Sequence, residues 1–305
     1  MRRLSVGMVF TVFAMLLALP TPVLAQTAKK RAEPLPKPRP ETLRTKDGVD
    51  LTAYYFGSNK GKAAVPVLLV HEWKGQKAPY GTLCLTLQKS GCAVLALDYR
   101  GHGGSREYKD RFGKTQEFNL KTMNKGHVLD IVRYDLEEAK RFLQRENNDG
   151  KLNLNALVVI GVRDGCVPAM LWAQRDWQFP NVGTRKQGHD VKGLVMISPK
   201  RLLKGVPVES ALTDPNIASL PTMIVVGEGS NEQSDADRIY KRVEVMKKKI
   251  SGDKDPEGLK LLTVKEPLGG PSLVSGSPTV IPEIVKFITD EVKSDDLDNP
   301  WIERD

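Results

Sequence analysis

The sequence predicts an α/β protein with a mainly parallel central sheet that is flanked by helices on both faces. Short apolar runs recur along the chain, and each run is unbroken, as in strands that are buried on both faces. Segments with helical periodicity separate these runs, and such alternation is typical of a parallel sheet. The composition agrees, because 40% hydrophobic and 27% charged residues in a chain of 305 are ordinary values for a globular protein.

Six apolar runs are predicted strands, at residues 65–70, 93–97, 157–160, 194–197, 222–226 and 261–264. Four intervening or following segments are predicted helices, at residues 80–89, 127–146, 235–250 and 281–292. In the segment 127–146 the apolar residues recur at three- and four-residue intervals, which marks one face of a helix. Residues 45–56 are expected to add an antiparallel pair at one edge of the sheet. One domain is expected at residues 47–293.

The first 25 residues have the features of a cleavable export signal. Arg2 and Arg3 precede an apolar run at 6–19, which is followed by Pro20 and a short site that ends at Ala25. A membrane-spanning helix needs about 20 apolar residues, so the run favours cleavage over an uncleaved anchor. We therefore expect a signal peptide from Met1 to Ala25 and a mature protein that is secreted or periplasmic.

Residues 26–46 are predicted to be a linker that is rich in proline and lysine and is disordered. They contain seven basic and two acidic residues, and four prolines alternate with other residues between 34 and 40. Such a segment favours an extended spacer, and its charge allows peripheral contact of residues 29–46 with an anionic envelope surface. The rest of the chain, 47–305, has a net charge of only +2, which argues against nucleic-acid binding. Residues 294–305 are expected to form an acidic C-terminal tail.

The three cysteines, Cys84, Cys92 and Cys166, permit at most one intramolecular disulfide. Cys84 is expected on a helix and Cys92 at the start of the next strand. Buried free thiols are therefore the favoured interpretation, and a disulfide between Cys84 and Cys92 is the alternative.

Motifs at three strand ends resemble the α/β-hydrolase fold family of serine esterases. They are Val67-Leu-Leu-Val-His71 followed by a glycine at 75, Asp98-Tyr-Arg-Gly-His-Gly-Gly-Ser105, and Gly161-Val-Arg-Asp-Gly165. The resemblance covers about residues 45–292 and implies a three-layer fold with the nucleophile in the middle of the third motif. Only about 20 residues separate the strands that end at Ile197 and begin at Thr222, so the cap inserted there in many relatives must be minimal.

Other residue types occupy the positions that carry catalysis in this family. The nucleophile position holds Arg163, whose guanidinium stays protonated and cannot attack a carbonyl carbon. Ser230 stands where the resemblance implies the acid. The loop expected to hold the base, 266–275, contains no histidine, because the four histidines of the chain are His71, His102, His127 and His189.

The sequence therefore favours a pseudoenzyme that acts by binding or scaffolding in the cell envelope. The alternative is a non-standard hydrolase, similar to an esterase or a peptidase, with an unrecognised active site. Asp164 and Cys166 are the nearest residues of nucleophile type, but neither has the small flanking residues that the turn requires. The histidine spacing indicates no metal site, and we expect no cofactor. An unidentified small ligand or protein is the expected partner of a monomeric chain.

A degenerate pocket is expected where the catalytic site would lie, formed by His71, Glu72, Trp73, Arg163 and Asp164. The loop after the first strand and the turn at Arg163 face each other in relatives. An unpaired guanidinium at a helix N-terminus is unfavourable. We therefore expect an ion pair between Glu72 and Arg163 that fills the site. The alternatives are that Arg163 pairs with Asp164, extends into solvent, or holds a small anion together with the helix amides.

Overall fold

The computed structural model describes residues 34–183, 186–252, 256–294, 297 and 299–304. The expected signal peptide, and residues 26–33 of the expected linker, lie outside the described residues. The described residues from 34 onward belong to one compact unit.

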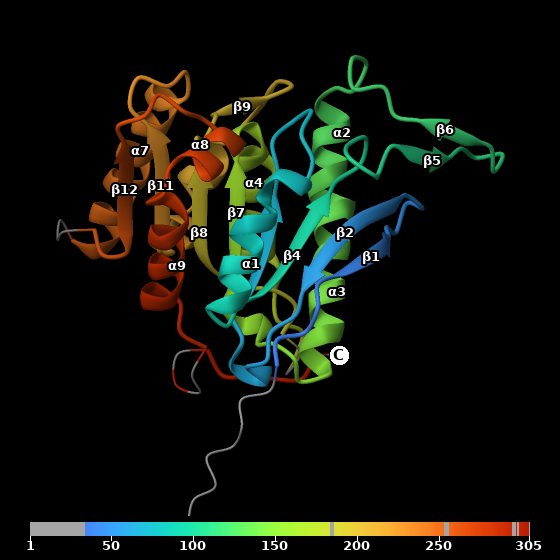
Figure 1. Cartoon of the computed structure of the whole chain (residues 1–305), viewed down its shortest axis with the longest axis horizontal. Helices are drawn as coiled ribbons and strands as arrows, with labels where there is room; N and C mark the ends of the chain where they lie inside the picture. Colours follow the sequence, from blue (N-terminus) through green and yellow to red (C-terminus); the bar gives the residue numbers. More distant parts are fainter. Residues whose placement is uncertain (1–33, 184–185, 253–255, 295–296, 298, 305) are drawn as a thin grey trace, which may run out of the picture. The chain divides into compact units, whose positions relative to one another are not determined.

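An eight-stranded sheet crosses this unit in the order β1-β2-β4-β3-β7-β8-β11-β12 (Figure 1). Its strands are β1 (Arg39–Arg44), β2 (Asp50–Phe56), β3 (Pro66–Val70), β4 (Ala93–Asp98), β7 (Leu157–Val162), β8 (Val191–Ile197), β11 (Thr222–Gly227) and β12 (Leu259–Val264). β2 is antiparallel to both of its neighbours, and every other neighbouring pair in this sheet is parallel. The predicted mainly parallel sheet is confirmed.

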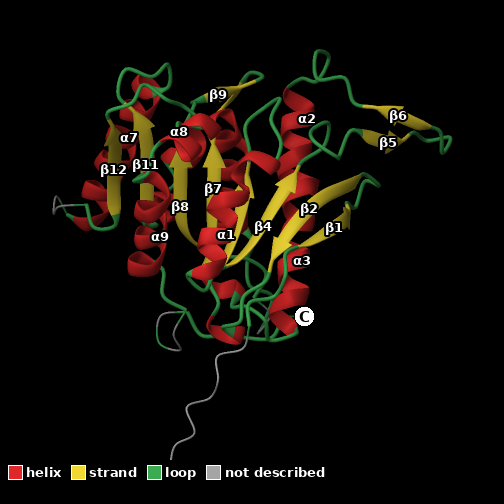
Figure 2. Ribbon diagram, viewed as in Figure 1, coloured by secondary structure: helices red, strands yellow, loops and turns green. Residues whose placement is uncertain are grey.

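Helices cover both faces of the sheet, as Figure 2 shows. One face carries α1 (Gly81–Lys89), α8 (Pro271–Gly276) and α9 (Val280–Glu291). The other carries α2 (Lys125–Asp130), α3 (Leu136–Asn148), α4 (Cys166–Gln178) and α7 (Gln233–Ser251). In β3, Val67 and Leu69 pack in the core on the face that carries α1, α8 and α9. Leu68 and Val70 pack in the core on the opposite face. Because both faces are covered, the strand has to be apolar at every position.

The predicted domain boundary at residues 46 and 47 is wrong. Arg39–Arg44 form β1, which pairs with β2, so the antiparallel edge lies at 39–56 and part of the expected linker belongs to the sheet. Leu43 in β1 is buried in the core. The alternating prolines indicated an extended segment, and an edge strand is an extended segment that tolerates proline.

Two long connections begin at the carboxyl ends of strands in the sheet. Between β8 and β11 lie the hairpin β9 (Leu202–Leu203) and β10 (Val206–Pro207) and the short helices α5 (Glu209–Leu212) and α6 (Pro215–Ser219), so the predicted minimal cap is confirmed. Between β4 and α2, the hairpin β5 (Glu107–Lys109) and β6 (Thr115–Glu117) projects from the body at the right of Figure 1. This second hairpin was not predicted, because its strands are short and polar.

The single helix expected at 127–146 is divided. A π-helical turn, Ile131–Asp135, separates α2 from α3. The buried carboxylate of Asp135 at the end of this turn accepts hydrogen bonds from the backbone N and the Nε of Arg100, at 2.8 and 2.9 Å. The irregular turn therefore lies where the helix meets the loop that follows β4.

The end of the chain packs against the domain. Arg304 is 6% exposed and donates to the side chains of Asn155 and Asp190. The indole N–H of Trp301 donates to the carbonyl oxygen of Asn147 at 3.3 Å. Arg304, the basic residue of the expected acidic tail, thus holds the tail against the domain.

All three cysteines are buried and free, which confirms the favoured interpretation of their pairing. Burial raises the pKa of Cys84 to about 12 and the pKa of Cys92 to about 11. Among the helices in the described part of the chain, none combines the length and the apolar character that crossing a bilayer requires.

Candidate functional site

The turn after β7 has the backbone of a nucleophile elbow. β7 ends at Val162, a 3₁₀ turn covers Arg163–Gly165, and α4 follows directly. Arg163 has a φ of 49°, a left-handed conformation that costs a residue with a side chain about 1 kcal/mol or more. Strained backbone of this kind is concentrated at functional sites. The turn therefore keeps the geometry that exposes a side chain at the end of the strand.

Two glycines make this turn possible. A Cβ atom on Gly161 would lie 2.7 Å from the Cα of Cys166, and one on Gly165 would lie 2.0 Å from the carbonyl oxygen of His71. Neither position has room for a side chain unless the backbone moves. The sharp strand-to-helix turn implied by Gly161 and Gly165 is present.

The guanidinium of Arg163 forms an ion pair with Glu232. Nη2 of Arg163 donates to Oε1 of Glu232, which is the residue just before α7. The side chain of Glu232 is 3% exposed, whereas that of Arg163 is 33% exposed. A buried carboxylate is costly unless it is paired, so this contact neutralises a charge that water does not reach.

The loop before α8 makes room for both side chains. A Cβ atom on Gly270 would lie 2.6 Å from Cδ of Arg163, and one on Gly269 would lie 2.5 Å from Oε2 of Glu232. The backbone N of Gly270 donates to Oγ of Ser198 at 2.9 Å, which fixes the loop against the end of β8. The family places its catalytic base in this loop, and here the Arg163 side chain packs against glycine.

The expected ion pair between Glu72 and Arg163 is not formed. The hydroxyl of Tyr80 donates to Oε2 of Glu72, and Oε1 of Glu72 lies against Gly75, where a Cβ atom would be 2.3 Å away. Glu72 is thus held within the loop after β3 by the residue that precedes α1. Arg163 meets a different acid on the opposite side of the elbow.

The loop after β3 and the elbow are joined through Asp164 instead. Oδ1 of Asp164 accepts a hydrogen bond from the backbone N of Trp73 at 2.7 Å. Of the alternatives for Arg163, neither pairing with Asp164 nor extension into solvent describes the contact that is present. Asp164, which follows Arg163 in the sequence, accepts a hydrogen bond from the backbone N–H of Trp73 on the other side of the site.

Behind these loops lies a cluster of buried aromatic side chains, made of His71, Trp73, Tyr99 and His102. Nδ1 of His71 donates to the carbonyl oxygen of Glu72 at 2.7 Å, and Nδ1 of His102 donates to that of Arg100 at 2.9 Å. Burial lowers the pKa of each histidine to about 4. Both rings are therefore neutral at physiological pH, and each is fixed to the backbone of its own loop.

Of the five expected site residues, four lie together along the loop after β3 and at the elbow, and Arg163 turns away to Glu232. Neither Glu232 nor Gly270 was predicted as a site residue. Ser230, which stands at the expected acid position, has a buried hydroxyl with no hydrogen-bond partner in the described part of the structure. Glu232 lies two residues beyond Ser230, just before α7. An acidic residue at that place was the one feature of the sequence that could have pointed to it as the partner of Arg163.

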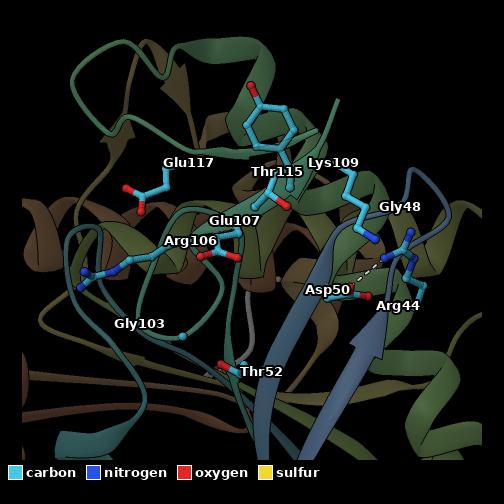
Figure 3. Close-up of a pocket in the computed structure, with 12 residues that line it drawn as sticks. Arg44, Gly48, Asp50, Thr52, Gly103, Arg106, Glu107, Lys109, Thr115 and Glu117 are labelled. Carbon is cyan, nitrogen blue, oxygen red and sulfur yellow. Dashed lines mark hydrogen bonds and ion pairs between the residues drawn. The ribbon is translucent and has the colours of Figure 1, made fainter. Parts of the chain in front are cut away.

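A cavity of about 400 Å³ lies between the edge of the sheet and the β5–β6 hairpin (Figure 3). Its charged lining residues are Arg44, Arg106, Lys109, Asp50, Glu107 and Glu117. In Figure 3 the guanidinium of Arg106 lies on the opposite side of the cavity from Arg44 and Lys109. Arg44 donates to Asp50 at 2.7 Å, and both side chains are more than half exposed. Balanced charges on an exposed rim do not select a ligand of either sign.

Within the described residues, no group of three or more His, Cys, Asp or Glu side chains is arranged to hold a metal ion.

Similar solved structures are esterases and related hydrolases. The Pyrococcus furiosus esterase Pf2001 aligns with 84% of this chain and 91% of its own, with a TM-score of 0.57 and 16% identity. The α/β hydrolase GrgF from Penicillium sp. sh18 aligns with 84% of this chain and 99% of its own, with a TM-score of 0.58 and 12% identity. The thermophilic carboxylesterase EstE1, cloned from a metagenomic library, aligns with 86% of this chain and 91% of its own, with a TM-score of 0.56 and 14% identity. At these identities the likeness concerns the fold alone.

Sequence comparison is less informative. No family model matches the chain. Two uncharacterised proteins of Mycobacterium tuberculosis, from strains CDC 1551 / Oshkosh and ATCC 25618 / H37Rv, are each 34% identical to it over 71 residues. The match covers 23% of this chain, and the chain spans about a quarter of the length of these curated relatives.

Proposed function

We propose that this chain, which has the α/β-hydrolase fold, is a pseudoenzyme that acts by binding or scaffolding in the cell envelope. The observation that carries the proposal is the ion pair of Arg163 with Glu232 at the elbow. A guanidinium is protonated at physiological pH and has no free electron pair with which to attack a carbonyl carbon. The residue at the nucleophile position is therefore a partner for a carboxylate rather than an acylation site.

The position of the catalytic base supports the same conclusion. In the triad mechanism an imidazole takes the proton of the nucleophile and returns it to the leaving group. The chain has no histidine after His189, and the loop before α8 presents Gly269 and Gly270 to the elbow. Beside this loop, Arg163 and Glu232 form an ion pair. An ion pair of this kind therefore stands where the triad mechanism needs a group that relays a proton.

The contact between Asp164 and Trp73 is a third supporting observation. In this fold the oxyanion is stabilised by the N–H of the residue after the nucleophile and by an N–H from the loop after β3. The backbone N of Trp73 belongs to that loop, and it already donates to the carboxylate of Asp164 at 2.7 Å. A substrate oxyanion would have to displace a group of the same charge, which opposes transition-state stabilisation.

Export to the envelope is part of the proposal and rests on the sequence. Residues 1–25 have the composition of a cleavable signal, and the basic residues that follow allow contact with an anionic surface. Since β1 begins at Arg39, deleting residues 26–33 leaves the whole sheet in place. Cell fractionation of this deletion beside the full chain tests whether the basic segment holds the protein at a membrane surface.

Labelling with a fluorophosphonate probe tests the absence of a catalytic serine. Purified residues 26–305 are treated with the probe beside an active serine esterase, and each protein is weighed intact by mass spectrometry. We expect a mass increase for the esterase and none for this chain. Covalent labelling of one serine, located by peptide mapping, would support the alternative that the chain is a hydrolase with an active site outside the family motifs.

A further inference from the structure

A cavity of about 490 Å³ lies near the antiparallel edge of the sheet, on the face that carries α1, between β2 and the start of α1. Its apolar lining residues are Pro38, Tyr54, Phe56, Ala78, Leu85 and Ala96. The volume falls in the range of small-molecule sites, and a mainly apolar wall with a few polar groups is typical of them. Arg163 and Glu232 are not part of its lining.

The polar groups of this cavity include Gln76, Lys77 and Asp98. Nζ of Lys77 donates to Oδ2 of Asp98 and to Oγ1 of Thr52. An ammonium group has three N–H donors, so these two bonds leave one donor unused. The Lys77 side chain is 15% exposed and lines the cavity. A ligand atom that accepts a hydrogen bond would satisfy the remaining donor.

The polar end of the cavity carries no net charge. Burial raises the pKa of Asp98, but the ammonium of Lys77 and the N–H groups of Lys77 and Gly104 outweigh it and hold the pKa below its usual value. The carboxylate therefore balances the ammonium. His71, whose Nε2 lies 3.7 Å from Oδ1 of Asp98, is neutral. A ligand carboxylate would add an uncompensated negative charge beside Asp98, whereas a carbonyl oxygen would add none.

We infer that this cavity binds an uncharged apolar molecule that carries one carbonyl group. The apolar part of the ligand packs against Tyr54 and Phe56, and its carbonyl oxygen accepts a hydrogen bond from Lys77. The inference gives the proposed binding role a site and a ligand class. It does not depend on whether the elbow at Arg163 is catalytic, because the cavity is lined by other residues.

Gly81 offers a way to fill the cavity without disturbing the fold. It lines the cavity at the first position of α1, with a helical φ of −55° and ψ of −42°. A Cβ atom built on Gly81 has no heavy atom within 4 Å, so a larger side chain can begin there without a clash. Leucine also favours a helix more than glycine does. Thr82→Leu is the matched control, because Thr82 is the next residue of the same helix, is exposed and does not line the cavity.

Three naphthalene derivatives test the ligand class. 2-Acetylnaphthalene carries the carbonyl group, 2-ethylnaphthalene has the same shape without an acceptor, and 2-naphthoate carries a carboxylate. Binding to purified residues 26–305 is followed by ¹H–¹⁵N NMR shift changes at ligand concentrations up to about 0.5 mM. We expect saturable binding of 2-acetylnaphthalene and binding of the other two that is weaker by about fivefold or more, as one lost hydrogen bond implies.

The variants decide where the ligand binds. Gly81→Leu is expected to weaken binding of 2-acetylnaphthalene by about tenfold or more, whereas Thr82→Leu changes it by less than about twofold. Unchanged binding to Gly81→Leu, tighter binding of 2-naphthoate, or no saturable binding of 2-acetylnaphthalene overturns the inference. Because the readout is binding, such a failure leaves the proposed inactivity standing, and ester turnover would overturn that proposal alone.

Discussion

Replacing either member of the Arg163–Glu232 pair shows how strongly this contact holds the elbow. Arg163→Met removes the charge and keeps an unbranched chain that can pack against Gly270. Glu232→Gln keeps the shape of the side chain and removes its charge. The two single variants and the double variant together form a cycle that isolates the interaction between the two residues.

The two single variants are expected to differ because the two groups differ in burial. Arg163→Met leaves the carboxylate of Glu232, which is 3% exposed, without its cation, and we expect a loss of about 2–4 kcal/mol in the free energy of unfolding. Glu232→Gln leaves a guanidinium that is one-third exposed and can bind water, so the expected loss is about 1–2 kcal/mol. The double variant is expected to be about 1–2 kcal/mol more stable than the sum of the single losses predicts.

Urea unfolding followed by tryptophan fluorescence measures these differences. The pair of Arg201 with Glu209 is a matched control, because the side chain of Arg201 is also 33% exposed whereas that of Glu209 is 40% exposed. For the cycle of Arg201→Met and Glu209→Gln we expect an interaction below about 0.5 kcal/mol. Additive losses at Arg163 and Glu232, or equal interaction energies in the two pairs, would show that the buried carboxylate does not depend on Arg163.

The buried histidines, the glycine beside Arg163 and the C-terminal anchor each give a further measurable outcome. Burial holds the pKa of His102 at about 4 against an ordinary value of 6.5, so the unfolded chain takes up the proton first as the pH falls. The stability difference between the wild type and His102→Asn should therefore shrink by up to about 3 kcal/mol from pH 6.5 to pH 4, and a pH-independent difference in urea midpoints would contradict this. Gly270→Ala places a Cβ atom 2.6 Å from Arg163 Cδ at a φ of 59° and should cost about 2 kcal/mol or more in urea unfolding, whereas Gly252→Ala, at a φ of 70° in open space, should cost about 1 kcal/mol. Arg304→Met leaves the buried Asp190 with less compensation and should lower the thermal midpoint by several degrees, whereas the exposed Glu303→Gln should leave it unchanged.

The sheet could be predicted because both of its faces are covered by helices. Unbroken apolar strands such as β3 and β7 follow directly from that requirement, and they are visible without any knowledge of their neighbours. β1 was missed because an edge strand has one neighbour and therefore shows a weaker hydrophobic pattern, with Leu43 as its fully buried residue. The β5–β6 hairpin was missed because each of its strands has only three residues, Tyr108 is their one apolar side chain, and none of these residues is fully buried.

The place of Arg163 could be predicted, but its partner could not. Gly161 and Gly165 mark a sharp turn after a strand, and that spacing is local in the sequence. The choice between Glu72 and Glu232 depends on contacts between distant segments. Tyr80 holds Glu72 within its own loop, and Gly270 opens the space through which the Arg163 side chain passes. None of these contacts has a signature at the spacing of a motif.

Hydrolysis of p-nitrophenyl acetate by purified residues 26–305, measured beside the Arg163→Ala variant, tests most directly whether the elbow is inactive. We predict that the two rates agree within about twofold, because Arg163 supplies no nucleophile. Arg163→Ser should not raise the rate, since the loop at Gly269 and Gly270 supplies no base. A clear turnover by the wild-type chain that disappears in Asp164→Asn or Cys166→Ser would contradict the account.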